Sequence, residues 1–129
     1  MKAITIQQPF AELIAQGRKR YEFRTWKTAY RGEILIHAAK KVDREAAARF
    51  GESAAYDTGC IVAKAVLSDC IWVDASFRKK LKREDAKVYE GILRDEAWKG
   101  YAFLLEDVCR TECVPMKGML GLWEYDGGY

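Results

Sequence analysis

The sequence holds little from which a metal centre, a membrane anchor or a secreted scaffold could be built. Its 129 residues include only one histidine, and no stretch is apolar over the length that a bilayer requires. The first residues also lack the apolar run of a signal peptide. We therefore expect a cytoplasmic protein whose cysteines stay reduced, because cytosolic thiols are kept open. They are Cys60, Cys70, Cys109 and Cys113.

The spacing of the cysteines speaks against zinc. Cys109 and Cys113 are the nearest pair, but they fall within a strand-like pattern from Leu104 to Val114. Four positions along a strand separate two residues by roughly 13 Å, too far for both to bind one ion. His37 follows an apolar run and is expected to be a buried core imidazole. We therefore predict no metal site and no cofactor.

The bulk composition is that of one folded domain. Half of the residues are hydrophobic and 32% are charged, a balance unlike that of a disordered chain. The length is near the commonest domain size, so we assign residues 1–129 to a single domain. A net charge of +3 permits an anionic partner without requiring one. Basic side chains gather in the first third of the chain, at Arg18, Lys19, Arg20, Arg24, Lys27, Arg31, Lys40, Lys41 and Arg44.

Periodicity predicts the elements, since alternating apolar residues indicate strands and a spacing of three to four indicates helices. A short helix over 9–16 is expected before Gly17, which suits a helix end. A second helix begins at the N-cap Asp43 and ends at Phe50, before a loop over 52–59. The charged stretch Phe77 to Trp98 is predicted as a solvated surface helix or lid. Strands are predicted over 4–7, 19–26, 33–38, 60–73, 101–108, 113–115 and 119–123.

The order of these elements favours an α+β fold. The regular alternation of strands and helices that indicates a doubly wound parallel sheet is missing. No internal repeat or linker divides the chain. We therefore expect a small mixed β-barrel with short flanking helices.

One motif in the first third is specific enough to indicate a family. It reads Gly17-x-Lys19-x-x-Glu22-x-Arg24-x-Trp26 and combines a turn glycine, three charges and an aromatic residue at fixed offsets. Together with the segments 6–14, 30–38 and 117–123, it resembles the ASCH superfamily. That resemblance implies a PUA-like β-barrel with a cleft beside the motif that binds RNA. It also implies possible chemistry, because some members hydrolyse acylated nucleosides and others cut RNA.

The residues of the motif suit such a cleft on physical grounds. Lys19 can offer an ammonium to a phosphate or, if it is desolvated, lose its proton and act as a base. Glu22 and Arg24 share a strand face, so the carboxylate can orient the guanidinium toward a phosphate or a base edge. Trp26 on the same face offers a platform on which a base can stack. The plainer alternative is a surface ion pair of Glu22 and Arg24, worth about 0 to 1 kcal/mol, beside an aromatic residue that only packs.

Three further polar residues are candidates for the same cleft. The amide of Gln8 can read a base edge, although it equally suits a plain helix start. Arg31 can bind a phosphate or hold the turn to Gly32, and Lys117 can bring another cation. The ligand set predicted from the sequence is thus Gln8, Lys19, Glu22, Arg24, Trp26, Arg31 and Lys117.

Three functions are compatible with this pattern. The favoured one is a module that binds RNA or a nucleotide-like small molecule, away from any membrane. The second is a small metal-independent hydrolase, a ribonuclease or an amidohydrolase of acylated nucleosides, with Lys19 as base and Glu22 as its partner. The amidohydrolase branch has a threonine nucleophile where this chain has Glu22, so its mechanism does not carry over. The third is a protein-interaction module.

Overall fold

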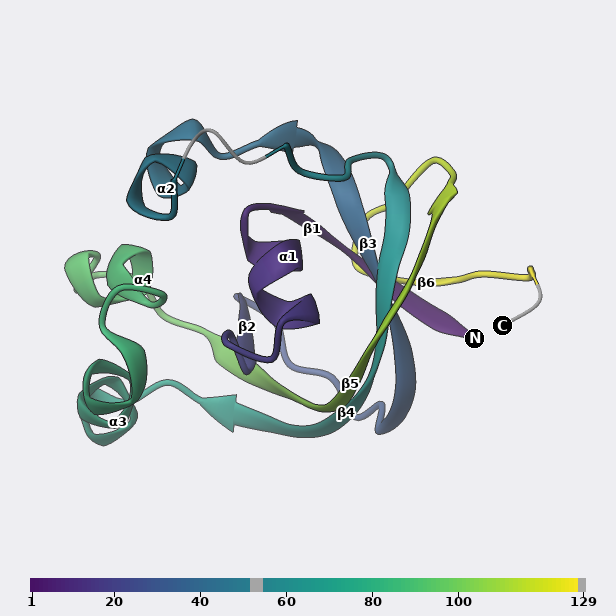
Figure 1. Ribbon diagram of the computed structural model, residues 1–129. Coiled ribbons are helices and arrows are strands. Elements are labelled where there is room, and N and C mark those ends of the chain that lie inside the picture. Colours follow the sequence, from purple (N-terminus) through teal and green to yellow (C-terminus); the bar gives the residue numbers. More distant parts are fainter. Residues whose placement is uncertain (52–54, 128–129) are drawn as a thin grey trace.

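The strands form one strongly curved sheet around a short helix (Figure 1). The computed structural model describes residues 1–51 and 55–127, so the loop predicted over 52–59 lies partly outside the described residues. The strands are β1 (Lys2–Gln8), β2 (Tyr21–Arg24), β3 (Gly32–Val42), β4 (Cys60–Trp72), β5 (Tyr101–Pro115) and β6 (Leu122–Glu124). Their spatial order is β2-β5-β4-β3-β1-β6.

This sheet is mixed and open. β1 runs parallel to β3, and the other neighbouring strands pair antiparallel. Within the described residues the outer strands β2 and β6 do not pair with each other, so the predicted closed β-barrel is wrong, whereas the α+β class is confirmed. Both outer strands are short, four and three residues, and β6 pairs with β1 only as far as Ile4. The edge of β1 beyond that point has no strand beside it.

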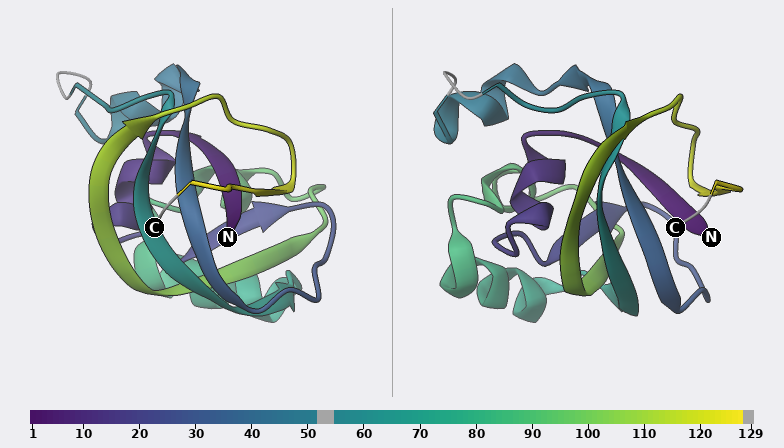
Figure 2. Two further views of the ribbon diagram at one scale, coloured as in Figure 1. Left: turned by 90° about the vertical axis from the view of Figure 1, so that its right-hand side faces the viewer. Right: turned by 45° about the vertical axis from the view of Figure 1, so that its right-hand side comes forward.

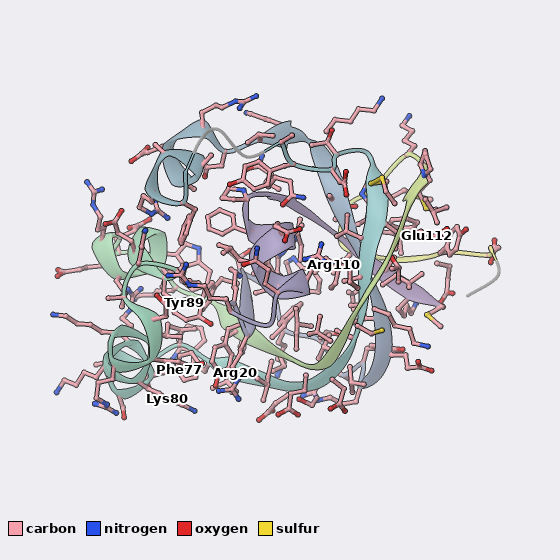
Figure 3. The ribbon with its side chains drawn as sticks, viewed as in Figure 1. Arg20, Phe77, Lys80, Tyr89, Arg110 and Glu112 are labelled. Carbon is pink, nitrogen blue, oxygen red and sulfur yellow. A yellow bond between two sulfur atoms is a disulfide. The ribbon has the colours of Figure 1, made fainter. Side chains whose placement is uncertain are left out.

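Helix α1 (Phe10–Ala15) fills the concave side of the sheet. It begins after Pro9 and has its C-cap at Gln16, and the next residue, Gly17, has a φ of 78°, which suits a residue without a Cβ. Its buried side packs into the main core with isoleucines and alanines of β1, β3 and β4. Its outer side is fixed by Glu12, which accepts hydrogen bonds of 2.7 and 2.8 Å from Arg110 of β5 (Figure 3).

The charged segment over 77–98 forms two helices rather than the one predicted, α3 (Ala75–Asp85) and α4 (Glu90–Arg94). Arg78 of α3 connects them. Its guanidinium donates to the backbone oxygen of Ile92 at 2.6 Å and to that of Trp98 at 2.8 Å. The last carbonyl groups of a helix have no hydrogen-bond partner within the helix. Arg78 therefore donates to backbone carbonyls at and after the end of α4 that would otherwise have to bond to water.

A second core lies between these helices and the sheet. Phe77 and Tyr89 pack around Tyr21 of β2, with ring centroids 5.0 and 6.2 Å from its ring (Figure 3). The hydroxyl of Tyr89 also accepts a hydrogen bond of 2.9 Å from the backbone N–H of Arg20. The segment is therefore packed against the sheet along one side. Helix α2 (Arg44–Arg49) lies on the same side of the sheet (Figure 1). None of the described helices is long and apolar enough to cross a membrane.

Two of the cysteines form a disulfide. Cys60 begins β4 and Cys113 lies near the end of β5, and the pairing of these strands brings their Cα atoms to 5.3 Å. The prediction that all four cysteines are reduced is therefore wrong for this pair, while Cys70 and Cys109 are free. The prediction rested on the expected cytosolic location, and the sequence alone does not indicate which cysteines meet across two paired strands.

Candidate functional site

The turn after α1 places Lys19 in the interior. The backbone N–H of Lys19 donates to the carbonyl of Leu13 at 3.0 Å, which folds the chain back under the helix. The residue is only 3% exposed, and its amine lies 5.7 and 5.2 Å from the ring centroids of Phe10 and Phe23. A charged amine in such surroundings needs an anionic partner.

Glu22 of β2 supplies that partner. Its Oε1 accepts a hydrogen bond of 2.9 Å from Lys19 Nζ, which also donates to the backbone oxygen of Tyr21. Its Oε2 accepts from Arg24 Nε at 3.2 Å and Nη2 at 2.9 Å. The side chains of Lys19 and Glu22 are 4% and 12% exposed, so the arrangement is not an exposed surface pair. We call Lys19, Glu22 and Arg24 the triad.

Arg24 also joins two edges of the sheet that no strand connects. Its Nη2 donates to the backbone oxygen of Thr5 at 2.8 Å. Thr5 lies on β1 just beyond the last residue that pairs with β6. Within the described part of the chain, Arg24 Nη1 makes no hydrogen bond, so its two N–H donors have no protein partner.

Burial and neighbouring charges act in opposite directions on the triad. Burial lowers the pKa of the Lys19 amine, and attraction to Glu22 offsets this only in part. Burial alone would raise the pKa of the Glu22 carboxyl, but Lys19 and Arg24 together lower it below its ordinary value. Glu22 is therefore ionised at neutral pH. Lys19 holds its proton less firmly than an ordinary lysine does.

The triad lines a cavity of about 480 Å³. This volume falls in the range of small-molecule sites, which are mostly apolar with a few polar groups that fix orientation. The other walls come from β1, α1, β2, the N-cap of α2 and the segment around α4. They consist of Thr5, Ile6, Gln7, Phe10, Phe23, Asp43, Val88, Tyr89, Gly91 and Ile92.

Asp43 contributes a second carboxylate to the cavity. Its Oδ1 accepts a hydrogen bond of 3.0 Å from the backbone N–H of Ala46, which makes it the N-cap of α2 as predicted. Its backbone N–H donates to the carbonyl of Gln8 at 2.8 Å and ties the cap to the end of β1. Its Oδ2 accepts no hydrogen bond from any described residue. Two residues that line the cavity, Arg24 and Asp43, thus each have one polar atom without a hydrogen bond to any described residue.

Two residues predicted for the site, Gln8 and Trp26, do not line this cavity. Gln8 is fully buried, donates to the carbonyl of Asp57 at 2.8 Å and accepts from the backbone of α1 at 2.8 Å, so its amide serves the fold. Gln7 beside it lines the cavity instead. Trp26 is 37% exposed and packs edge-on against Phe103, with the centroids 5.2 Å apart. Its use as a stacking platform stays a prediction.

Arg31 and Lys117 also lie apart from the triad. Arg31 Nη1 donates to the backbone oxygens of Thr28 and Tyr30, both at 2.9 Å, and so holds the turn before β3. Lys117 lies between β5 and β6 and lines a separate hollow. The structure thus brings together three of the seven predicted ligand residues, those of the triad.

The sequence prediction missed several walls of the cavity. Asp43 was recognised only as a helix cap, because its position before a run of alanines explains it fully. Tyr89 comes from the charged segment, far along the chain from the motif, and no local pattern links the two. Thr5 and Gln7 had a usable signal, since they alternate with the buried Ile4 and Ile6 of β1.

The fold and the site together define a small α+β domain with a buried ion triad beside an open sheet edge. The ASCH domain family model matches residues 4–111, which include the triad and all the cavity walls. The chain belongs to the ASCH domain family.

Solved structures share its fold. An ASCH protein from Zymomonas mobilis is 24% identical, covers 88% of this chain and 72% of its own length, and has a TM-score of 0.61. Two mutant forms of that protein are 22% and 21% identical and cover 88% and 89% of this chain and 74% and 73% of theirs. Their TM-scores are 0.59 and 0.60. No curated protein matches the chain.

Proposed function

We propose that the cavity beside the triad binds the base of a nucleotide, either free or as a residue of single-stranded RNA. The observation that supports this most is that two lining residues, Arg24 and Asp43, keep a donor (Nη1) and an acceptor (Oδ2) that bond to no described residue. A nucleobase presents ring nitrogens and carbonyls to such a donor, and amino or ring N–H groups to such an acceptor. Membership of the ASCH family supports the same ligand class.

The walls of the cavity suit a flat ring. Phe10, Phe23 and Tyr89 line it, and the rings of Phe23 and Tyr89 meet edge to face at 5.8 Å. Base contacts with aromatic side chains are worth about 1 to 3 kcal/mol each and tolerate any base. A base in a duplex could not enter, so the RNA form of the ligand must be unpaired.

The Asp43 contact can be tested without damage to helix α2. Asp43→Asn keeps the cap, because asparagine caps a helix as well as aspartate does, but it replaces a charged acceptor. Asp74→Asn makes the same change at the cap of α3, where Asp74 accepts from the N–H of Phe77 at 2.8 Å outside the cavity. We expect Asp43→Asn to weaken binding of cytidine and adenosine monophosphates about 10-fold or more, and Asp74→Asn to leave it unchanged.

Titration calorimetry with the four nucleoside monophosphates and a short single-stranded RNA is the measurement. A parent protein that binds none of them, while it is folded, would refute the proposal. Equal effects of the two asparagine variants would show that Asp43 acts only through its helix.

One observation favours a metal-independent hydrolase as a second candidate. Burial lowers the pKa of Lys19, and a neutral amine would have two N–H groups for the oxygens of Tyr21 and Glu22 and a lone pair left over. That lone pair could accept a proton from water. Both Glu22 oxygens are occupied by the two cations, so Glu22 would position Lys19 rather than attack. Product analysis after incubation with RNA and with an acylated cytidine tests for turnover.

A further inference from the structure

A second hollow, of about 830 Å³, adjoins the triad cavity. Thr5 of β1 lines both of them, at the edge of the sheet that β6 leaves free. The segment that joins β5 to β6 forms one wall, and it arches away from the sheet before it returns to pair with β1 (Figure 2). The other lining residues are His37, Ala39, Lys40, Gly59, Pro115, Met116, Lys117, Gly118, Met119 and Leu120.

Charge distinguishes this hollow from the first cavity. Its lining includes Lys40 and Lys117 and no carboxylate. Neither lysine forms a salt bridge with a residue that the structure describes, whereas Lys64 on the same sheet is paired with Glu33 at 2.6 Å. The aliphatic part of the Lys40 side chain lies over Gly59, where an added Cβ would be 3.3 Å from Lys40 Cγ. An anion in the hollow would therefore meet two cations that have no other charge to neutralise.

The wall beneath the lysines is polar and tightly built. His37 is 2% exposed, which confirms the expected buried imidazole, and its Nε2 lies 2.8 Å from the carbonyl of Met116. A carbonyl only accepts, so Nε2 donates this hydrogen bond. Nδ1 is buried and has no partner among the described residues. Thr5 Oγ1 accepts from Trp123 at 3.2 Å, which leaves its own hydroxyl proton free to donate.

Apolar side chains complete the rim of the hollow. Leu120 and Met119 are 97% and 58% exposed, unusually open for such residues, and they lie on the same segment as Lys117. A ligand with both a charged group and an apolar ring or sugar face would use the lysines and the rim together.

We infer that this second hollow binds the phosphate of the nucleotide whose base occupies the triad cavity. The inference rests on the proposed function and adds to it the place of the phosphate. The triad cavity contains as many carboxylates as cations, Glu22 and Asp43 against Lys19 and Arg24, so it does not favour an anion. The charged residues that line the adjoining hollow, Lys40 and Lys117, are both cationic. A nucleotide that spans Thr5 would place each of its two parts in the hollow of matching chemistry.

The test compares a nucleoside with its 5′-monophosphate on the parent and on a Lys40→Ala/Lys117→Ala double variant. The parent should bind the monophosphate about 10-fold or more tighter than the nucleoside at low salt, and the double variant should bind both alike. A Lys79→Ala/Lys82→Ala variant removes the same charge from the exposed side of α3 and should keep the preference.

The same variants are then titrated with short single-stranded RNA. This second experiment distinguishes binding of a phosphate in an RNA backbone from binding of the phosphate of a free nucleotide. Loss of two phosphate contacts should reduce the slope of log affinity against log salt by about 1.4. A double variant that keeps the preference for the monophosphate would overturn the inference, while nucleoside binding would still support the proposed function. If the parent bound neither nucleoside nor monophosphate, the proposed function itself would be wrong.

Discussion

Replacing Glu22 with glutamine tests whether the triad is held by charge. The carboxylate accepts one hydrogen bond from Lys19 and two from Arg24, and its side chain is 12% exposed. Removal of one partner from a buried pair costs roughly 3 to 5 kcal/mol, because the other charge stays buried without compensation. Arg24 is 23% exposed and can turn toward water, but Lys19 at 4% cannot. We therefore expect Glu22→Gln to lose about 3 kcal/mol of stability at pH 7.

The pH dependence of that loss identifies Lys19 as its cause. An unfolded lysine has a pKa near 10.4, and burial holds the folded pKa of Lys19 below this value. Between the folded and the unfolded pKa the unfolded chain binds more protons, so stability rises with pH. Glu22→Gln removes the attraction that opposes burial and lowers the folded pKa further. Its stability should begin to rise at a lower pH than that of the parent, and the difference between them should narrow toward pH 10.

Urea unfolding at pH 7, 8, 9 and 10 measures both effects, with Glu33→Gln as the matched control. Glu33 pairs with Lys64 at 2.6 Å, but the two side chains are 53% and 37% exposed, so its loss should cost less than about 1 kcal/mol at any of these pH values. A folded Glu22→Gln protein as stable as the parent at pH 7 would refute the reasoning. So would a loss that stayed constant up to pH 10, since a cost independent of Lys19 ionisation would not be electrostatic.

Two further predictions concern the frame around the site. Gly118→Ala should destabilise the protein by about 1 to 3 kcal/mol, because a Cβ there would lie 2.6 Å from Thr5 Oγ1 and 2.7 Å from His37 Cε1. Thermal melting measures this loss. Gly91→Ala is the control, because a Cβ at Gly91 would meet nothing within 4 Å. Cys113→Ser removes a cross-link between residues 53 positions apart and should cost up to about 4 kcal/mol in the chain-entropy view. A melting temperature of the parent that did not fall on addition of reductant would contradict this second prediction.

The parts of the fold that the sequence predicted correctly are those set by local periodicity. Ile4 and Ile6 alternate with Thr5 along β1, and these two isoleucines are 1% and 2% exposed. The same alternation puts Gln8 on the buried face with Ile6 and turns Gln7 outward, which is the pattern that indicates Gln7 as the glutamine lining the cavity. The triad was found because its three members lie within one turn and one strand.

The parts that were missed depend on contacts between distant segments. The turn between α3 and α4 follows from Tyr89, which packs on Tyr21 and accepts from the backbone of Arg20. The pattern of charged residues over 77–98 does not indicate either contact. The disulfide likewise depends on the register of β4 against β5, which places Ile61 opposite Val114 and so brings the cysteines together. The register of two strands depends on how all the strands of the sheet pack together, so a local sequence pattern does not predict it.

The open edge of the sheet explains why the site lies where it does. A closed barrel would pair β2 with the strand at the other end and would cover the backbone of β1 beyond Ile4 with a ladder. Here β6 stops at that point, and the guanidinium of Arg24 reaches across to the carbonyl of Thr5 in place of a strand. A side chain fills less space than a strand, and both the cavity and the second hollow are lined by Thr5, the residue that Arg24 contacts. The position of Arg24 is in turn fixed by Glu22, and that of Glu22 by Lys19. The triad thus connects the two strand edges beside the cavity, so we expect a change of its charges to lower the stability of the fold and, under the proposed function, to weaken binding as well.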